Sequence, residues 1–224
     1  MMTSLFSMFD PTTKFNMQLN WTMMIIVFII MPYPYWKSLS RSSMVMNIII
    51  NVLNKEFNAL FKKMILMKGT TLIFISLFLI ILINNLTSNY PYTFCCPAQL
   101  CFSLSLSIPI WSSIIVFYWL SLTKSMLSHL VPAGTPYILM PLMVIIEMIS
   151  NLIRPLALAV RLTANLIAGH LLMALLGNMM NFNQKLWLLI LILQAMFLFF
   201  EIMVAMIQSY VFSVLMTLYS SEMS

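Results

Sequence analysis

The stretch Leu156-Ala-Leu-Ala-Val-Arg161-Leu-Thr-Ala-Asn165-Leu-Ile-Ala-Gly169-His170 places an arginine deep inside a long apolar segment. Arginine keeps its positive charge at any working pH. Its insertion into a hydrocarbon layer costs at least ~2.5–3.5 kcal/mol, so a compensating contact is needed. A mobile negative charge on a partner is the functional candidate for that contact, and an internal salt bridge to Glu201 is the structural alternative.

The composition indicates a polytopic membrane protein. Of the 224 residues, 62% are hydrophobic and 7% are charged, whereas a soluble domain carries about 25% charged residues. No soluble fold can bury so much apolar surface, and the length suits one helical membrane domain over residues 1–224. We therefore expect an all-α integral membrane protein with about five membrane-embedded helices and one amphipathic surface helix.

The positive charge predicts membrane topology rather than binding to nucleic acid. The formal net charge is +6, and six of the 11 lysines and arginines lie between residues 37 and 68, among hydrophobic runs. The positive-inside rule puts this segment on the inner side, with the N-terminus outside and the C-terminus inside. The chain has no glycine-rich phosphate loop, so we expect no directly bound nucleotide and no cofactor.

The cysteines and the first residues exclude further classes. Cys95, Cys96 and Cys101 have no metal-ligand spacing and form no even set for disulfides, so we expect no metal site. Residues 1–20 lack the pattern of a secretory signal peptide and of an arginine-rich presequence. The 23 methionines fit a mitochondrial genome with an expanded methionine codon set.

Hydrophobic runs and their spacing predict the helices. The apolar positions of residues 44–67 recur at helical spacing, which predicts the amphipathic surface helix. The final two hydrophobic segments contain about 43 and 36 residues, far more than the ~20 of a perpendicular span. Each is either a span with a surface extension or one long, strongly tilted helix. The predicted membrane-embedded segments are Asn20 to Trp36, 70–88, 98–122, 136–178 and 184–219. Gly69 is expected to end the amphipathic helix, and 121–135 is expected to be a loop. The last segment contains no glycine or proline, which favours one continuous helix there.

Polar side chains form a stripe on the fourth predicted span. At ~100° per residue, Glu147, Arg154, Arg161 and Asn165 share one face, and His170 points about 180° away from Arg161. Glu147 either pairs with Arg154 or lines a proton path. Arg154 can also be an interfacial residue, and Asn165 can simply hydrogen-bond to another helix.

The fifth predicted span carries Gln194, Glu201 and Gln208 at steps of seven residues, so they also share one face. The short connection at 179–183 predicts antiparallel packing, which would bring Glu201 next to His170. An ionisable pair inside a membrane suits proton relay. The structural alternatives are a packing role for His170 and an interhelical hydrogen bond for Gln208.

Four long motifs occur together in this chain. They are Arg161 to His170 as quoted above, His129-Leu-Val-Pro-Ala-Gly-Thr-Pro136, Glu147-Met-Ile-Ser-Asn-Leu-Ile-Arg154-Pro155 and Ile207-Gln208-Ser-Tyr-Val-Phe-Ser-Val-Leu. They resemble the a subunit family of the proton-driven rotary ATP synthases, and the resemblance covers essentially the whole chain. The chain ends, Met1 to Pro11 and Thr217 to Glu222, look like those of arthropod mitochondrial members of that family.

The resemblance implies a proton-translocating stator subunit that is not catalytic alone. The family's a subunit holds two offset aqueous half-channels beside a rotating ring of c subunits, each with a carboxyl group in mid-membrane. Arg161 would match the essential arginine, which attracts each carboxylate and blocks direct proton passage between the half-channels. The implied location is the mitochondrial inner membrane, with the N-terminus in the intermembrane space and the C-terminus in the matrix.

The family's other functional positions carry over residue by residue. His170 and Glu201 would belong to the half-channel on the intermembrane-space side, and Glu147 would line the exit path to the matrix. Asn165 and Gln208 would lie at the interface with the ring. Bacterial relatives often have a carboxylate at the position of His170 and a histidine at the position of Glu201, so that the two residue types are exchanged. Further implied partners are the peripheral-stalk subunits, other membrane-sector subunits, the lipid bilayer and protons.

Two other classes of protein remain as alternatives. A secondary transporter would show inverted repeats with broken helices, and a subunit of a redox-driven pump would show haem-ligating histidine pairs; neither pattern is present. A purely structural membrane subunit would not need the set Arg161, His170 and Glu201.

Overall fold

The computed structural model describes residues 5–12, 18–30, 32, 40–61, 69–90, 93–131, 136–179 and 187–222, and these ranges contain helices and no strand. This confirms the predicted all-α class. The short 3-10 helices are η1 (Leu5–Phe9), η2 (Leu19–Trp21) and η3 (Cys96–Ala98). The α-helices are α1 (Thr22–Ile30), α2 (Arg41–Phe61), α3 (Thr70–Ser88), α4 (Leu100–Ser121), α5 (Thr123–His129), α6 (Met140–Asn178) and α7 (Trp187–Glu222).

Within the described ranges, four helices are long and apolar enough to cross a membrane, namely α3, α4, α6 and α7. They correspond to four of the five predicted spans. The remaining one, Asn20 to Trp36, is described only in part, where α1 has 9 residues; residues 31 and 33–39 lie outside the described part. The segment 121–135, predicted as a loop, contains the short helix α5.

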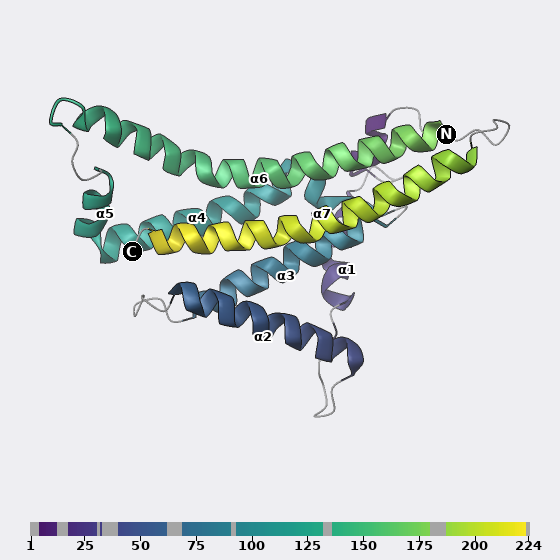
Figure 1. Ribbon diagram of the computed structural model, residues 1–224, viewed down its shortest axis with the longest axis horizontal. Helices are drawn as coiled ribbons and strands as arrows, with labels where there is room; N and C mark the ends of the chain where they lie inside the picture. Colours follow the sequence, from purple (N-terminus) through teal and green to yellow (C-terminus); the bar gives the residue numbers. More distant parts are fainter. Residues whose placement is uncertain are drawn as a thin grey trace.

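The last two hydrophobic segments are each one continuous helix. α6 has 39 residues and α7 has 36, which at 1.5 Å per residue gives about 58 and 54 Å. Pro141 lies in the first turn of α6, where its missing N–H has no intrahelical partner. Pro155 lies inside α6, which is bowed but unbroken (Figure 1). Both helices are much longer than the ~30 Å hydrocarbon core.

The predicted amphipathic helix is α2, which begins at Arg41 rather than at residue 44. Residues 62–68, at its predicted end, lie outside the described part of the chain. Gly69, which was predicted to end this helix, directly precedes α3 with a φ of 94°. That left-handed conformation is open to glycine without strain, so Gly69 starts the next helix.

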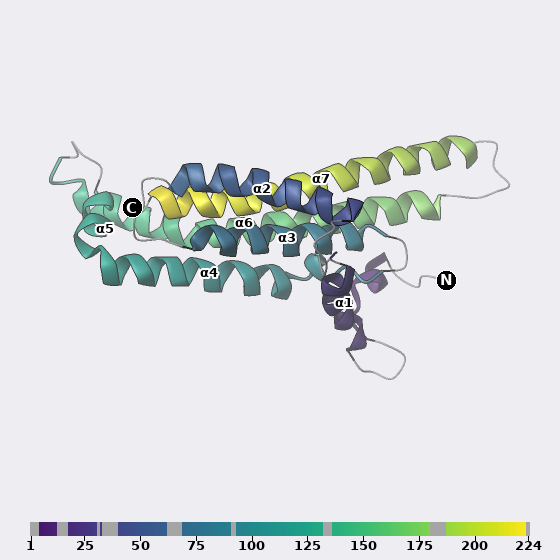
Figure 2. The same cartoon turned by 90° about the horizontal axis from the view of Figure 1, so that it is seen from below.

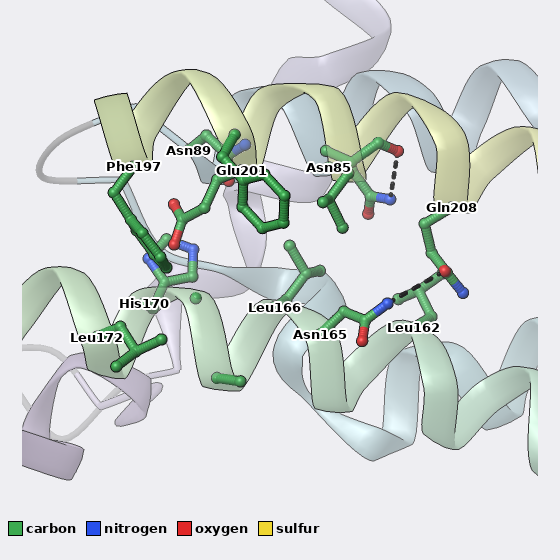
Figure 3. A pocket seen from close by; sticks show the side chains of 15 residues that line it. Asn85, Asn89, Leu162, Asn165, Leu166, His170, Leu172, Phe197, Glu201 and Gln208 are labelled. Carbon is green, nitrogen blue, oxygen red and sulfur yellow. Dashed lines mark hydrogen bonds between the residues drawn. The ribbon is translucent and has the colours of Figure 1, made fainter. Parts of the chain in front are cut away.

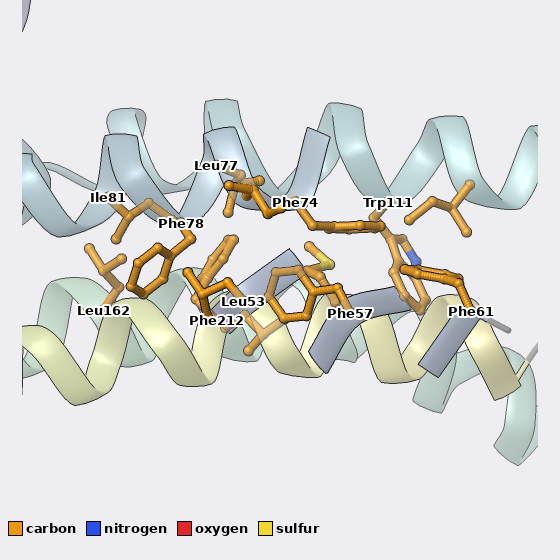
Figure 4. Packing of buried hydrophobic residues seen from close by; sticks show 14 of the residues in the cluster. Leu53, Phe57, Phe61, Phe74, Leu77, Phe78, Ile81, Trp111, Leu162 and Phe212 are labelled. Carbon is orange, nitrogen blue, oxygen red and sulfur yellow. The ribbon is translucent and has the colours of Figure 1, made fainter. Parts of the chain in front are cut away.

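The apolar face of α2 packs against α3 and α7. Phe57 and Phe61 are buried there, and the Phe61 ring stacks on Phe74 with 5.8 Å between ring centroids (Figure 4). On the same side, the Tyr210 hydroxyl donates a hydrogen bond of 3.2 Å to the Glu56 carboxylate. The ring contact attaches α2 to α3, and the hydrogen bond attaches α2 to the C-terminal half of α7.

The four long helices run roughly along one direction, and α1 crosses that direction (Figures 1 and 2). α7 packs against α3 and α6, and α4 packs against α6. One end of the bundle holds η1, the end of α6 and the start of α7; the other end holds α5, the start of α6 and the end of α7 (Figure 1). The distance of a residue along α6 is therefore also its approximate distance along the long direction of the bundle.

Candidate functional site

A cavity of about 340 Å³ lies between α3, α6 and α7, toward the end of the bundle where α6 finishes. Much of its wall is apolar, which keeps the local dielectric low. Electrostatic interactions between polar groups in the cavity are therefore stronger than in water. Its polar lining comes from all three helices (Figure 3). The polar residues are Asn85 on α3 and Asn89 directly after it, Asn165 and His170 on α6, and Glu201 and Gln208 on α7.

Glu201 and His170 lie next to each other in this cavity. The Glu201 carboxylate points toward the His170 imidazole (Figure 3). α6 and α7 can approach here because Gly169 has no side chain. A Cβ on Gly169 would overlap Glu201 Oε1 and would lie 3.0 Å from Glu201 Cδ. The predicted antiparallel pairing of Glu201 with His170 is therefore confirmed.

Several buried polar atoms around the cavity have no hydrogen-bond partner among the described residues. They are Asn85 Oδ1, Asn89 Nδ2 and Oδ1, His170 Nε2, Glu201 Oε1 and Gln208 Nε2. Buried polar atoms normally have a partner from protein or water. A cavity of this volume with several polar groups in reach can hold water molecules that satisfy them. The arrangement is thus suited to a short hydrated path between ionisable groups.

Asn85 and Asn89 are site residues that the sequence analysis missed. Asn85 lies in the last turn of α3, and Asn89 caps that helix four residues later with helical backbone angles, so both lie on the same side. Asn85 is fully buried, and its Nδ2 donates to the backbone oxygen of Ala205 on α7 at 3.4 Å. The available signal was the recurrence of asparagine at helical spacing near the end of an apolar span.

Asn165 and Gln208 join α6 to α7 at the other end of the cavity. The Asn165 Nδ2 group donates to Gln208 Oε1 at 3.2 Å (Figure 3). The structure thus shows the interhelical hydrogen bond that was one explanation of these residues. Together with the Gly169–Glu201 contact, this bond sets the register between α6 and α7.

Arg161 lies outside the cavity, one helical turn before Asn165, on an exposed part of α6. Ala157, Ala164 and Ala168 are exposed within two helical turns of it, so small side chains lie on the same part of the helix surface. Small residues allow another helix to approach closely in a membrane. Within the described part of the chain Arg161 makes no salt bridge, so the alternative of a pair with Glu201 is not found.

Glu147 and Arg154 form a separate group on the other side of Arg161. Arg154 Nη2 lies 3.7 Å from Glu147 Oε1, which is the ion pair that the spacing allowed. Along α6, Glu147 precedes Arg161 by about 21 Å and His170 follows it by about 13.5 Å. The structure therefore does not bring Glu147 into the cavity, and it orders the three groups along the bundle.

Neither the cysteines nor the acidic residues suggest a metal centre. Among the described residues, no three histidine, cysteine or acidic side chains cluster closely enough to hold a metal ion. Cys95 and Cys96 are buried before α4, and burial raises the pKa of the Cys95 thiol to about 11. A thiol with so high a pKa carries little thiolate and is unreactive at neutral pH.

Comparison with known proteins gives consistent matches over the chain. The family model of the ATP synthase A chain matches residues 17–221. The chain is 50% identical over 225 residues to ATP synthase subunit a of Drosophila simulans, with 100% of both chains covered. It is 49% identical over 227 residues to the same subunit of Aedes aegypti and of Anopheles gambiae, again with 100% of each chain covered.

Proposed function

The chain belongs to the ATP synthase A chain family, and from this premise we propose that it couples proton flow to rotation of a ring of c subunits. Membership makes it a multi-pass membrane subunit of the ATP synthase complex, as the motifs around Arg161 predicted. In the proposal it is a stator that carries protons and performs no catalysis alone. The partners are the c-ring with its mid-membrane carboxylates, the peripheral stalk and the other membrane-sector subunits.

The observation that carries this proposal is the order of groups along α6. A polar cavity with His170 and Glu201 lies on one side of Arg161, and Glu147 lies on the other. Arg161 itself is on the exposed face. Two proton paths that end at different levels, with a fixed positive charge between them, supply the geometry that rotary coupling needs.

The cavity serves as the half-channel on the intermembrane-space side. Water held by Asn85 and Asn89 connects the outside to Glu201 and His170, which pass the proton toward the ring. A carboxylate and an imidazole can each accept and release a proton, whereas the amides only orient water. Asn165 and Gln208 stand at the inner end of this path, near the level of Arg161.

When a ring carboxyl group loses its proton to the matrix half-channel, Arg161 attracts the resulting carboxylate. Glu147 lines the exit of that half-channel. The guanidinium always stays charged and presents a fork of donors to a carboxylate. It also repels a proton that would cross directly from one half-channel to the other. Each elementary charge that crosses the membrane gains ~2.3 kcal/mol per 100 mV, which drives the rotation.

The proposed location is the mitochondrial inner membrane, with the N-terminus in the intermembrane space and the C-terminus in the matrix. α5 with Lys124 and the C-terminal end of α7 lie at the same end of the bundle (Figure 1). The cavity lies toward the opposite end, near η1. The positive-inside rule then places the cavity on the intermembrane-space side.

A test of the cavity uses a cysteine at Leu166, which lines it and is only 8% exposed. In a background with Cys101→Ser, we expect silver ion to inhibit proton flux through the Leu166→Cys complex at least tenfold, because thiolate forms only where water is present. The control is Ile192→Cys, which is 53% exposed on the outer face of α7 and away from the cavity. If the Ile192→Cys complex reacts and the Leu166→Cys complex does not, the hydrated path is wrong.

Gly169→Ala should reduce proton-driven ATP synthesis by roughly tenfold, because the new methyl group displaces the Glu201 carboxylate, and a shift of ~1 Å can cost up to 10²-fold. The matched control is Gly177→Ala on the same helix, where an added Cβ meets nothing within 4 Å. Rates are compared at equal amounts of assembled complex. Equal rates for the two variants would contradict the placement of Glu201.

A further inference from the structure

Arg154 connects Glu147 on α6 with the last turns of α7. We propose that Arg154 is a positioning residue that holds the Glu147 carboxylate in place, and that Tyr219 holds Arg154 in turn. The inference rests on the proposed function, in which Glu147 lines the exit path. It adds the C-terminal end of α7 to the parts of the molecule on which proton release depends.

The Arg154 guanidinium contacts both residues. Its Nη2 lies 3.7 Å from Glu147 Oε1, and its Cζ lies 4.7 Å from the centroid of the Tyr219 ring. A planar guanidinium stacks on an aromatic face and still directs its N–H groups outward. The ring therefore restricts the position of the charge, and the charge restricts the carboxylate.

Tyr219 is itself fixed by α4. Its ring packs edge-to-face on Trp111, with 5.8 Å between ring centroids and an interplanar angle of 85°. Trp111 is only 4% exposed. The Tyr118 hydroxyl, also from α4, donates a hydrogen bond of 2.7 Å to the backbone oxygen of Ser220. α4 thus holds the end of α7 by two contacts, one to the ring that supports Arg154 and one to the residue that follows it.

This support matters because the Glu147 side chain is otherwise free to move. Its side chain is 40% exposed, against 25% for Arg154. A glutamate with three rotatable bonds loses substantial conformational entropy when it is held in one place. The guanidinium, already immobilised on Tyr219, can restrict the carboxylate without losing much further freedom of its own. Proton release through Glu147 then occurs from a defined position.

The test must separate Glu147 from the other titratable and charged groups on the helices that pack around Arg154. On α6 these are Glu147 and Arg154, on α7 Tyr219, and on α4 Tyr118, whose hydroxyl is bonded to Ser220. Glu222 follows Tyr219 by three residues and is the other carboxylate close in sequence. Glu222→Gln is therefore the control that separates the two carboxylates.

The experiment measures potential-driven proton flux through the whole complex in vesicles, at equal amounts of assembled complex. We expect Arg154→Gln to lower the flux about tenfold and Arg154→Lys to recover at least a third of it, because a cation over the ring is retained. Tyr219→Leu should lower the flux about threefold, whereas Tyr219→Phe should retain at least half. A substitution at Tyr219 is expected to affect proton flux through Arg154 because residues in one contact network are not independent.

Double variants distinguish positioning from general loss of structure. Glu147→Gln with Arg154→Gln should be no slower than Glu147→Gln alone, since Arg154 then has no carboxylate to place. Multiplied losses would overturn the inference, as would a loss of the same size in Glu222→Gln. Full flux in Arg154→Gln, together with low flux in Glu147→Gln, would overturn the inference and leave the proposed function intact. Full flux in Glu147→Gln would remove the proposed role of Glu147 itself.

Discussion

Arg161→Ala is expected to abolish proton-driven ATP synthesis, by at least ~10²-fold, while passive proton leak is retained or increased. The side chain lies on the exposed face of α6, between the cavity and Glu147. Removal of its charge removes the attraction for a ring carboxylate, and losses of this order are typical when a preorganised charge at a reaction centre is deleted. It also removes the electrostatic barrier between the half-channels, so protons can cross without turning the ring.

The measurement compares ATP synthesis and potential-driven proton flux in the same reconstituted vesicles. Val160→Ala is the matched control, because Val160 is the neighbouring residue on α6 and is 50% exposed. It should keep synthesis within about twofold, as expected for an apolar surface substitution. Unchanged coupling in Arg161→Ala would mean that Arg161 is only a structural residue, and the proposed mechanism would fail.

Glu201→Gln is expected to lower both ATP synthesis and proton leak, by about 10²-fold. The substitution keeps the shape of the side chain in the cavity beside Gly169 and His170 but removes its ability to take up a proton. Positioned proton transfer contributes typically 10²–10⁴-fold to a rate, and His170 remains as a second group. This loss of leak is the opposite of the result expected for Arg161→Ala.

The control is Gln194→Ala, one heptad before Glu201 on α7 and not part of the cavity lining. It should retain proton flux within about twofold. Proton flux and ATP synthesis are measured in parallel over a range of imposed potentials. A Glu201→Gln complex with normal flux would exclude Glu201 from the proton path and would leave His170 as the only ionisable group in the cavity.

The two expected phenotypes also separate the alternatives weighed for this sequence. A purely structural subunit would lose activity in both variants only through loss of assembled complex. In a stator with two half-channels, the proton leak of the two variants differs. Arg161 is the barrier, so its loss retains or increases the leak, whereas Glu201 carries the proton, so its loss lowers the leak. Membership of the ATP synthase A chain family argues against the transporter and redox-pump alternatives. The sequence also shows neither the inverted repeats of a transporter nor the histidine pairs of a redox subunit.

Much of the fold followed from patterns within single helices. Residues 70–88 were predicted as a span and form α3 with the same bounds. The absence of glycine and proline from 184–219 predicted the unbroken α7. The loop containing α5 was misjudged, because a helix of 7 residues is stabilised mainly by its contacts with α4.

The candidate site was predicted in part. The pairing of Glu201 with His170 was expected because a short connection forces neighbouring helices to pack antiparallel. The contribution of α3 was not expected, since Asn85 contacts Ala205 across a separation of 120 residues. The support of Arg154 by Tyr219 was missed for the same reason, because nothing in the α6 sequence indicates which α7 residue lies opposite.

The sequence by itself determined the membrane class, the extent of the long hydrophobic segments, the faces on which Arg161, His170 and Glu201 lie, and the family. Each of these depends on composition, motif or a helical repeat of 3.6 residues, which are local properties of the chain. Only the tertiary structure decided which faces meet. It showed that Gly169 makes room for Glu201, that α3 completes the polar cavity, and that Arg161 stays on the exposed face. Those outcomes depend on close packing between distant segments, where one side chain sets how near two helices come.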